Sequence, residues 1–246
     1  MEIAIFSDLH LDISEENPKN QKFLALLDEL CAEGISHLCL LGDIYDLFIG
    51  PQKFWRTVHR GLFEKLEALR KNGCEIYWVE GNHDFHIEKH LKALGIHVVL
   101  EDLRLELEGK KIFMSHGDTV NQEDEKYLKW RATTKSKAFR SLISAVPSFL
   151  GEKIFLPIAC RASNKSKRER IKGPQPEIDA LYVNYAKKLI EKEDFDAVLL
   201  GHHHKKCLEK LGKGFYLNVG GWESGKGAYA RWTPSNPQPQ IIDVSW

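Results

Sequence analysis

The sequence predicts an α/β protein of layered architecture, in which the strands are buried on both faces. Apolar runs of strand length alternate with segments of helical period over the first hundred residues. The strand-like runs are apolar throughout, which is typical of sheets covered on two sides. In addition, 43% of the 246 residues are hydrophobic and 28% are charged, so the chain can form a substantial core.

The first half of the chain is predicted to supply three strands and three helices. The predicted strands are residues 3–7, 37–41 and 75–79. The predicted helices are residues 23–32, 54–69 and 87–94. Gly34, Gly73 and Gly95 follow these helices, and glycine commonly ends a helix because it tolerates the left-handed conformation.

The second half begins with a predicted hairpin of residues 103–107 and 112–115, joined at Gly109-Lys110. Four later segments have strand character: residues 197–200, 215–219, 228–232 and 240–244. Between these groups lies a helical stretch that we expect to be broken at Pro147, Pro157 and Pro174-Gln175-Pro176. We predict that residues 121–193 form a helical cap insertion, and that residues 1–120 and 194–246 form the core of the same structural unit.

Whole-chain properties exclude several classes of protein. The formal net charge is zero, so no global charge indicates a nucleic-acid partner. No apolar run approaches the roughly 20 residues needed to span a bilayer. The first residues enter a strand directly, so we expect no signal peptide. The five cysteines are scattered, which argues against a disulfide framework and favours a cytoplasmic location.

Metal-binding residue types follow the ends of five predicted strands. In open α/β sheets the loops beyond the carboxyl ends of the strands gather at one edge, so residues distant in sequence can meet there. The five motifs are Asp8-Leu9-His10, Gly42-Asp43-Ile44-Tyr45-Asp46, Gly81-Asn82-His83-Asp84, Ser115-His116-Gly117-Asp118 and Gly201-His202-His203-His204.

Carboxylate, imidazole and amide ligands suit Mn²⁺, Fe²⁺ or Zn²⁺. Two such ions about 3.5–4 Å apart can activate water and hold a phosphoryl group, and Asp43 is the natural bridging carboxylate. Each motif alone has an explanation that needs no metal. An Asp-x-His sequence can arise by chance, Gly-Asp is common in turns, and His116 could be a buried structural histidine. The histidine run at 202–204 could also bind metal fortuitously. Five motifs in succession, each after a strand, favour a metal site.

In this order the motifs resemble those of the calcineurin-like metallophosphoesterase superfamily. The resemblance implies a four-layer α/β/β/α sandwich and two divalent metal ions. It implies one metal site formed by Asp8, His10, Asp43 and His204, and a second formed by Asp43, Asn82, His116 and His202. It further implies that His83 is catalytic and that Asp46 orients its imidazole. Strand alternation predicts that His203 points away from the metals.

The predicted cap resembles that of the bacterial UDP-2,3-diacylglucosamine pyrophosphatases of lipid A biosynthesis. The resemblance rests on His116-Gly117-Asp118-Thr119, Tyr127, Trp130-Arg131-Ala132 and the cluster at 161–167. Gly220-Gly221-Trp222 is also similar to a motif of that family. The chain departs from the family pattern at His83, where an arginine is usual, and at His203 and Lys205-Lys206.

This second resemblance implies hydrolysis of a nucleotide-sugar lipid, UDP-2,3-diacylglucosamine, to UMP and 2,3-diacylglucosamine 1-phosphate. It implies Mn²⁺ as the most suitable metal and a cytoplasmic enzyme attached peripherally to the inner membrane. The implied substrate-binding residues are Asn82, His83, Tyr127, Arg131, Arg161, Asn164, Lys165 and Lys167.

The composition of the cap fits a lipid substrate. Basic residues that could dock on anionic headgroups are Lys126, Lys129, Arg131, Lys135, Lys137 and Arg140. Apolar residues that could line an acyl pocket or enter the interface are Leu128, Trp130, Phe139, Leu142, Ile143, Val146, Phe149, Leu150 and Phe155. The alternative is that the apolar residues pack the cap onto the core and the charges are simply solvated.

Two further functions compete with this interpretation. A related metallophosphoesterase could act on another nucleotide diphosphate, a phospholipid or a general phosphodiester. A protein of another class would use the same fold as a non-catalytic scaffold that docks on a membrane. Retention of His83 and Asp46 argues against the scaffold, because a binding module needs no catalytic histidine. The sequence leaves the oligomeric state open.

Overall fold

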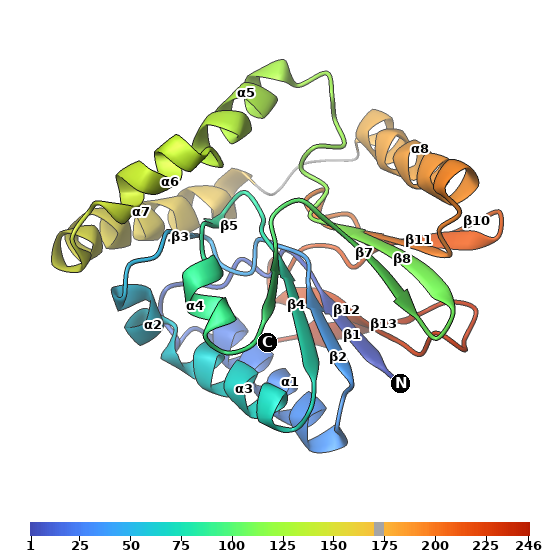
Figure 1. Cartoon of the computed structure of the whole chain (residues 1–246), viewed down its shortest axis with the longest axis horizontal. Coiled ribbons are helices and arrows are strands. Elements are labelled where there is room, and N and C mark those ends of the chain that lie inside the picture. The colour runs from blue at the N-terminus through green and yellow to red at the C-terminus, as the bar shows by residue number, and fades with distance from the viewer. Residues whose placement is uncertain (170–174) are drawn as a thin grey trace.

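The computed structural model describes residues 1–169 and 175–246 of the chain, and the side chains of residues 161–169 lie outside that description. Two main sheets lie face to face in the described residues (Figure 1). The strand order of the first sheet is β13 (Gln240–Ser245), β12 (Lys226–Trp232), β1 (Ile3–Phe6), β2 (His37–Leu40), β4 (Glu75–Val79) and β6 (His97–Val99).

The second main sheet contains the predicted hairpin. Its strand order is β10 (Cys207–Leu211), β11 (Gly214–Asn218), β9 (Ala197–Leu200), β8 (Lys110–Ser115) and β7 (Asp102–Leu107). A small additional sheet pairs β3 (Phe48–Ile49) with β5 (Asp84–Phe85). The pairs β1–β2, β2–β4 and β8–β9 are parallel, so within each sheet the carboxyl ends of these strands point to the same edge.

Alternation of side chains along the strands divides the core into three layers of contacts. Phe6 and Trp78 face the helices α1 (Pro18–Glu33) and α3 (Arg60–Lys71). Ile5 belongs to the cluster between the two sheets, which also contains Met114 of β8. Val198 of β9 faces outward, against α8 (Pro176–Glu193). The order of layers is therefore helix, sheet, sheet, helix, and the predicted α/β/β/α sandwich is confirmed.

The remaining helices lie around the edge where the parallel strands end (Figure 1). They are α2 (Phe54–Val58), α4 (Glu88–Lys92), α5 (Glu125–Thr134), α6 (Lys137–Ser144) and α7 (Ser148–Glu169). The single helix predicted for residues 54–69 is interrupted at His59. The break predicted at Pro157 is wrong, because α7 continues through it. Proline has no N–H to donate to the backbone carbonyl one turn earlier in the helix. Pro157 is exposed, so water can donate a hydrogen bond to that carbonyl instead.

The helices between β8 and β9 fall into two groups. Helices α5, α6 and α7 project together to one side, whereas α8 covers the second sheet and contacts β9 and β11 (Figure 1). Tyr182, Ala186 and Ile190 of α8 are buried in that contact. Within the described residues no single helix has the length and apolar character of a membrane span. Helix α6 and residues 148–160 together have that length and apolar character, but they are bent by 114° relative to one another.

Candidate metal centre

The five motifs meet at one edge of the molecule, as their positions after the strands predicted. Three of them follow β1, β2 and β4 of the first sheet, and the other two follow β8 and β9 of the second. The structure brings together all the predicted metal ligands: Asp8, His10, Asp43, Asn82, His116, His202 and His204. Their assignment as ligands remains our prediction.

Several of these residues have an unusual backbone conformation. Asp8, His10, Asp43, His202 and His204 all have φ between 47° and 67°. This left-handed region is unfavourable for residues with a side chain, and each such residue costs on the order of 1–3 kcal/mol. Strain of this kind concentrates at functional sites, where it aims side chains that relaxed turns would direct elsewhere.

Two glycines allow the motif loops to approach one another. A Cβ at Gly42 would lie 2.7 Å from Nδ1 of His116 and 2.8 Å from the Cα of Gly81. A Cβ at Gly81 would lie 2.5 Å from the backbone nitrogen of Asp43. Any side chain at these positions would therefore push the loops of β2, β4 and β8 apart.

The first group of candidate ligands consists of Asp8, His10 and His204. Nε2 of His204 lies 3.3 Å from Oδ1 of Asp8 and 3.1 Å from Nε2 of His10. The Asp8 carboxylate also accepts a hydrogen bond of 2.9 Å from the backbone N–H of His202. This bond ties the loop after β1 to the loop after β9, so one candidate group joins the two sheets.

The second group consists of Asp43, Asn82, His116 and His202. Oδ2 of Asp43 lies 3.4 Å from Nε2 of His116 and 3.7 Å from Nε2 of His10. Oδ1 of Asn82 lies 3.1 Å from Nε2 of His116. Asp43 therefore lies between the two groups, as a carboxylate that bridges two ions must.

The outer nitrogens of His10, His116 and His204 face oxygen atoms of neighbouring residues. Nδ1 of His116 donates to the carbonyl of Leu41 at 2.8 Å, and Nδ1 of His204 lies 2.6 Å from Oε1 of Glu223. Nδ1 of His10 lies 3.3 Å from Oδ1 of Asp46. A proton on Nδ1 leaves the lone pair on Nε2, and outer partners of this kind are usual for metal-binding histidines. The donor atoms therefore fit divalent metal ions.

Charge couples these groups strongly. Burial disfavours protonation of His116, but the Asp43 carboxylate outweighs it and raises the pKa to about 10. Burial likewise opposes protonation of His204, yet Asp8 raises that pKa to about 9. The pKa of Asp8 falls to about 2, because the charge of His204 overcomes the effect of burial. The carboxylates thus favour positive charge at this centre, whether it comes from protons or from metal ions.

His83 and Asp46 lie together, but not through the contact that we predicted. Nδ1 of His83 donates to the backbone carbonyl of Asp46 at 2.8 Å, whereas the Asp46 carboxylate faces His10. Nε2 of His83 lies 3.9 Å from Oδ2 of Asp43, and the side chain is 30% exposed. His83 is therefore the more open histidine beside Asp43, and it presents Nε2 to the centre.

His203 points away from the candidate ligands, as strand alternation predicted. Its Nε2 lies 2.5 Å from Oδ1 of Asp179, and its ring stacks on Tyr182 at 4.9 Å between centroids. The Tyr182 hydroxyl donates to the carbonyl of Gly117 at 2.9 Å. His203 thus anchors the loop after β9 to α8 and, through Tyr182, to the loop after β8.

Sequence reasoning missed three residues that shape the centre. The carboxylate of Glu223 contacts His204 from the turn before β12. The buried Asp84 accepts N–H bonds from Gly81, Asp43 and Ile44 at 2.8–2.9 Å. Nζ of the buried Lys19 donates to the carbonyls of Leu9 and His10. Asp84 stood inside a recognised motif, whereas no local signal marked Lys19 or Glu223.

The predicted substrate-binding residues of the cap are only partly described. Tyr127 and Arg131 both donate to Oδ2 of Asp118, at 2.9 and 2.6 Å. The ring of Tyr127 lies 5.8 Å from that of His202 between centroids. These contacts attach α5 beside the candidate second metal group. The predictions for Arg161, Asn164, Lys165 and Lys167 lie outside the described side chains.

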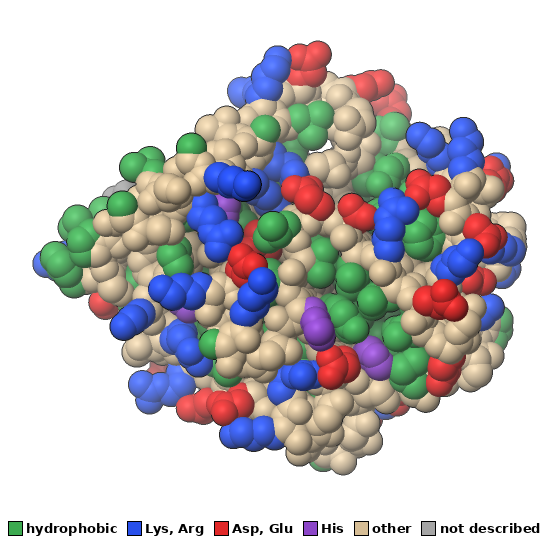
Figure 2. All heavy atoms as spheres, viewed as in Figure 1, with side chains coloured by type: hydrophobic (Ala, Val, Ile, Leu, Met, Phe, Trp, Pro, Cys, Tyr) green, Lys and Arg blue, Asp and Glu red, His purple; other side chains and the backbone are tan. Residues whose placement is uncertain are grey.

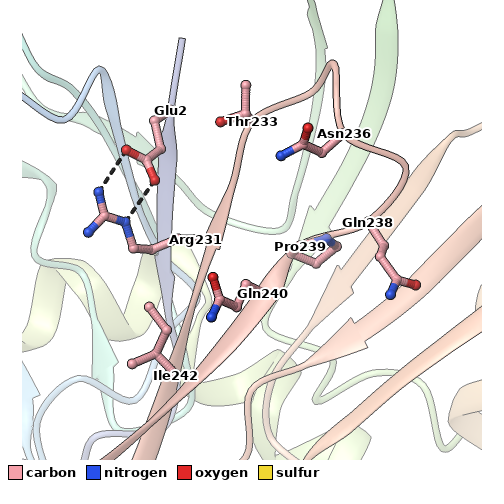
Figure 3. Close-up of a pocket in the computed structure, with 8 residues that line it drawn as sticks. All are labelled: Glu2, Arg231, Thr233, Asn236, Gln238, Pro239, Gln240 and Ile242. Carbon is pink, nitrogen blue, oxygen red and sulfur yellow. Dashed lines mark hydrogen bonds and ion pairs between the residues drawn. The ribbon is translucent and has the colours of Figure 1, made fainter.

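One surface pocket is remote from this centre. It has a volume of about 490 Å³ and lies beside Glu2 and Arg231, whose side chains form an ion pair (Figure 3). Glu2 precedes the first residue of β1, whereas Asp8 follows its last residue. The pocket is therefore at the opposite end of the strand from the candidate ligands, and we assign it no part in their chemistry.

Comparison with known families gives this geometry a context. The sequence model of the calcineurin-like phosphoesterases matches residues 1–206. The chain belongs to the calcineurin-like phosphoesterase family. It is accordingly a metallophosphoesterase hydrolase, and divalent metal ions belong to its chemistry.

Relatives of this calcineurin-like phosphoesterase carry a more specific name. The UDP-2,3-diacylglucosamine hydrolase of Psychromonas ingrahamii is 29% identical over 228 residues, which cover 90% of each chain. That of Klebsiella pneumoniae is 26% identical, covering 96% of this chain and 97% of its own. Among solved structures, an archaeal phosphodiesterase is similar over 99% of the chain with a TM-score of 0.54. At 14% identity, that similarity shows the fold alone.

Proposed function

We propose that this phosphoesterase hydrolyses the pyrophosphate bond of UDP-2,3-diacylglucosamine, releasing UMP and 2,3-diacylglucosamine 1-phosphate. The observation that carries the proposal is the helical cap, which is attached beside the candidate dinuclear centre through Tyr127 and carries exposed apolar side chains. The names of relatives that align along nearly the whole chain support the same substrate. A general phosphodiesterase acting on small substrates would have no need of such a cap.

The chemistry divides between the metal ions and the protein. Two divalent ions at the two groups would activate water and draw charge from the phosphoryl oxygens. The carbonyl of Asp46 keeps one ring proton of His83 on Nδ1, so Nε2 would carry a lone pair in the neutral ring and would donate a proton from the imidazolium form. A donor in this position stabilises the negative charge of the departing oxygen. Mn²⁺ is our choice of metal, since mixed carboxylate, amide and imidazole ligands suit it.

The cap has the character of a lipid-binding surface. Leu142 is 66% exposed and Phe149 is 69% exposed, on either side of the bend between α6 and α7. Figure 2 shows hydrophobic side chains gathered at this tip of the molecule. Further exposed apolar residues of the cap are Trp130, Leu150, Ile154 and Ile158. We propose that this tip enters the surface of the inner membrane from the cytoplasmic side.

The boundaries of the cap are also a proposal. We assign α5, α6 and α7 to it, and we place α8 with the core because its apolar face packs on the second sheet. Asp118 joins the cap to the centre through its bonds to Tyr127 and Arg131. A substrate bound under the cap would therefore lie close to His116 and His202.

The test is direct product analysis. The purified protein is incubated with UDP-2,3-diacylglucosamine and Mn²⁺ in mixed micelles, and UMP is measured by chromatography. We expect UMP and the lipid phosphate in equal amounts. Cleavage of simple phosphodiesters without any release of UMP would contradict the substrate and leave the reaction class intact.

A further inference from the structure

A second pocket, of about 530 Å³, opens directly beside the candidate metal centre. Its wall includes His204 and Glu223, the histidine and carboxylate that contact one another at 2.6 Å. The turn from Glu223 to Lys226 closes through two backbone hydrogen bonds, from Glu223 N–H to Lys226 and from Lys226 N–H to Glu223. One turn therefore both orients a candidate metal ligand and borders the pocket.

The pocket and the cap approach opposite ends of the candidate ligands. Tyr127 of the cap lies against His202, whereas the pocket lies against His204. His202 belongs to the group around Asp43 and His116, and His204 belongs to the group around Asp8 and His10. A molecule with a phosphoryl group at the centre could thus extend one part toward the cap and the other into this pocket.

The lining of the pocket suits a flat, anionic molecule. Its lining includes Gly220, Gly221 and Gly227 together with the apolar residues Val219, Ala228 and Val244. The pocket's charges are mostly paired: Lys206 with Asp243 at 2.5 Å, and Glu223 with His204. Among the described residues no carboxylate is ion-paired with Lys226, which leaves its positive charge for an anion.

We infer that this pocket receives the nucleotide half of the substrate, with the nucleobase against the glycine-containing wall and Lys226 beside the ribose oxygens. The inference rests on the proposed function, because it assumes a substrate that joins a nucleotide to a lipid. A pocket of this volume lies within the range of about 300–1,000 Å³ that small-molecule sites occupy. A charge-assisted bond from Lys226 would contribute substantially to nucleotide affinity.

The experiment measures binding of UMP and of inorganic phosphate by titration calorimetry, using the Mn²⁺-loaded full-length protein. Lys226→Glu reverses the charge, and Ser245→Trp fills the pocket from an exposed strand position. Lys210→Glu on β10 is the matched control, since Lys210 is exposed and does not line the pocket. We expect Lys226→Glu to raise the Kd of UMP by about tenfold more than that of phosphate.

The two proposals fail in different ways. Equal effects of Lys226→Glu on UMP and phosphate, or unchanged UMP affinity in both pocket variants, would overturn the nucleotide pocket. That result would be compatible with wild-type protein that still releases UMP from the lipid substrate. Conversely, the expected binding pattern in a protein that releases no UMP would support the pocket and contradict the proposed function.

Discussion

At the scale of single residues, His10, His116 and His204 each face an oxygen atom outside the centre. Leu41 supplies a carbonyl to His116, and Glu223 supplies a carboxylate to His204. The ligand types were predictable from sequence, because metal coordination restricts them to few residues placed just after strands. Their outer partners were not, since Glu223 and Lys19 are brought to the centre only by tertiary folding.

Glu223→Ala tests the importance of an outer partner. The substitution frees the His204 ring to rotate and removes the acceptor that fixes its tautomer. We expect metal affinity or activity to fall by about 10–100-fold, the usual effect of losing such a contact. Metal titration and phosphodiesterase assays would measure it. Glu209→Ala, at an exposed position of β10, is the control and should change neither quantity.

Proton release on metal binding tests the electrostatics of the centre. In the metal-free protein the pKa values of His116 and His204 are raised to about 10 and about 9, so both are protonated at pH 7. Coordination requires neutral imidazole, so these protons must leave. Calorimetry in buffers of different ionisation enthalpy should show release of about two protons per chain at pH 7. Metal affinity should rise with pH until about pH 9–10 and then level off.

The same pKa shifts set the pH dependence of the metal-free fold. A histidine whose pKa is raised by folding stabilises the protein fully below its unfolded value of 6.5. That stabilisation is lost as the pH rises through about 9 to 10. For the metal-binding prediction, a metal affinity that is independent of pH between 6.5 and 9 would contradict the raised pKa values of His116 and His204.

At the scale of secondary-structure elements, the long strands and helices followed from the apolar pattern, and short or interrupted ones did not. Residues 75–79 and 197–200 were predicted with the observed ends. The two-residue strands β3 and β5 were not predicted, because pairs this short have no periodicity to detect. The interruption at His59 also leaves no local mark, since both flanking helices keep an apolar face.

The apolar tip of the cap makes a prediction about membranes. The double variant Leu142→Gln and Phe149→Gln removes two exposed apolar side chains on either side of the α6–α7 bend. Each would contribute about 1.5–3 kcal/mol on full burial, so vesicle affinity should fall by at least about tenfold. Sedimentation with vesicles of phosphatidylglycerol and phosphatidylethanolamine would measure it. Leu100→Gln, an exposed position outside the cap, is the control, and equal loss in both proteins would argue against the membrane-docking tip.

At the scale of the whole molecule, the centre joins the two sheets. Asp8 and Asp43 follow strands of the first sheet, whereas His116 and His204 follow strands of the second. The resemblance of the motifs to a known family implied the sandwich, and the apolar strand pattern agreed with it. We expected residues 121–193 to form one cap, and the sequence did not separate α8 from the cap helices, because the contact of α8 with β9 and β11 arises only in the folded chain.

Ions bound between the sheets should stabilise the entire fold. At a metal concentration about 100-fold above Kd, binding to the folded state alone adds roughly 2.7 kcal/mol per site. For a chain of this size each site should raise Tm by about 5–10 °C. Thermal unfolding followed by circular dichroism, with Mn²⁺ or with a chelator, would measure the shift. An unchanged Tm would mean that the ions do not bind between the sheets.

The most direct test of the dinuclear centre is the number of metal ions bound per chain, measured by elemental analysis after reconstitution with Mn²⁺ under reducing conditions. Wild-type protein should bind two ions and hydrolyse phosphodiesters. Asp43→Ala, which removes the carboxylate between the two groups, should bind fewer than two and lose activity by at least about 100-fold. A wild-type protein that binds no ion, or an Asp43→Ala variant that keeps both ions and full activity, would contradict the account.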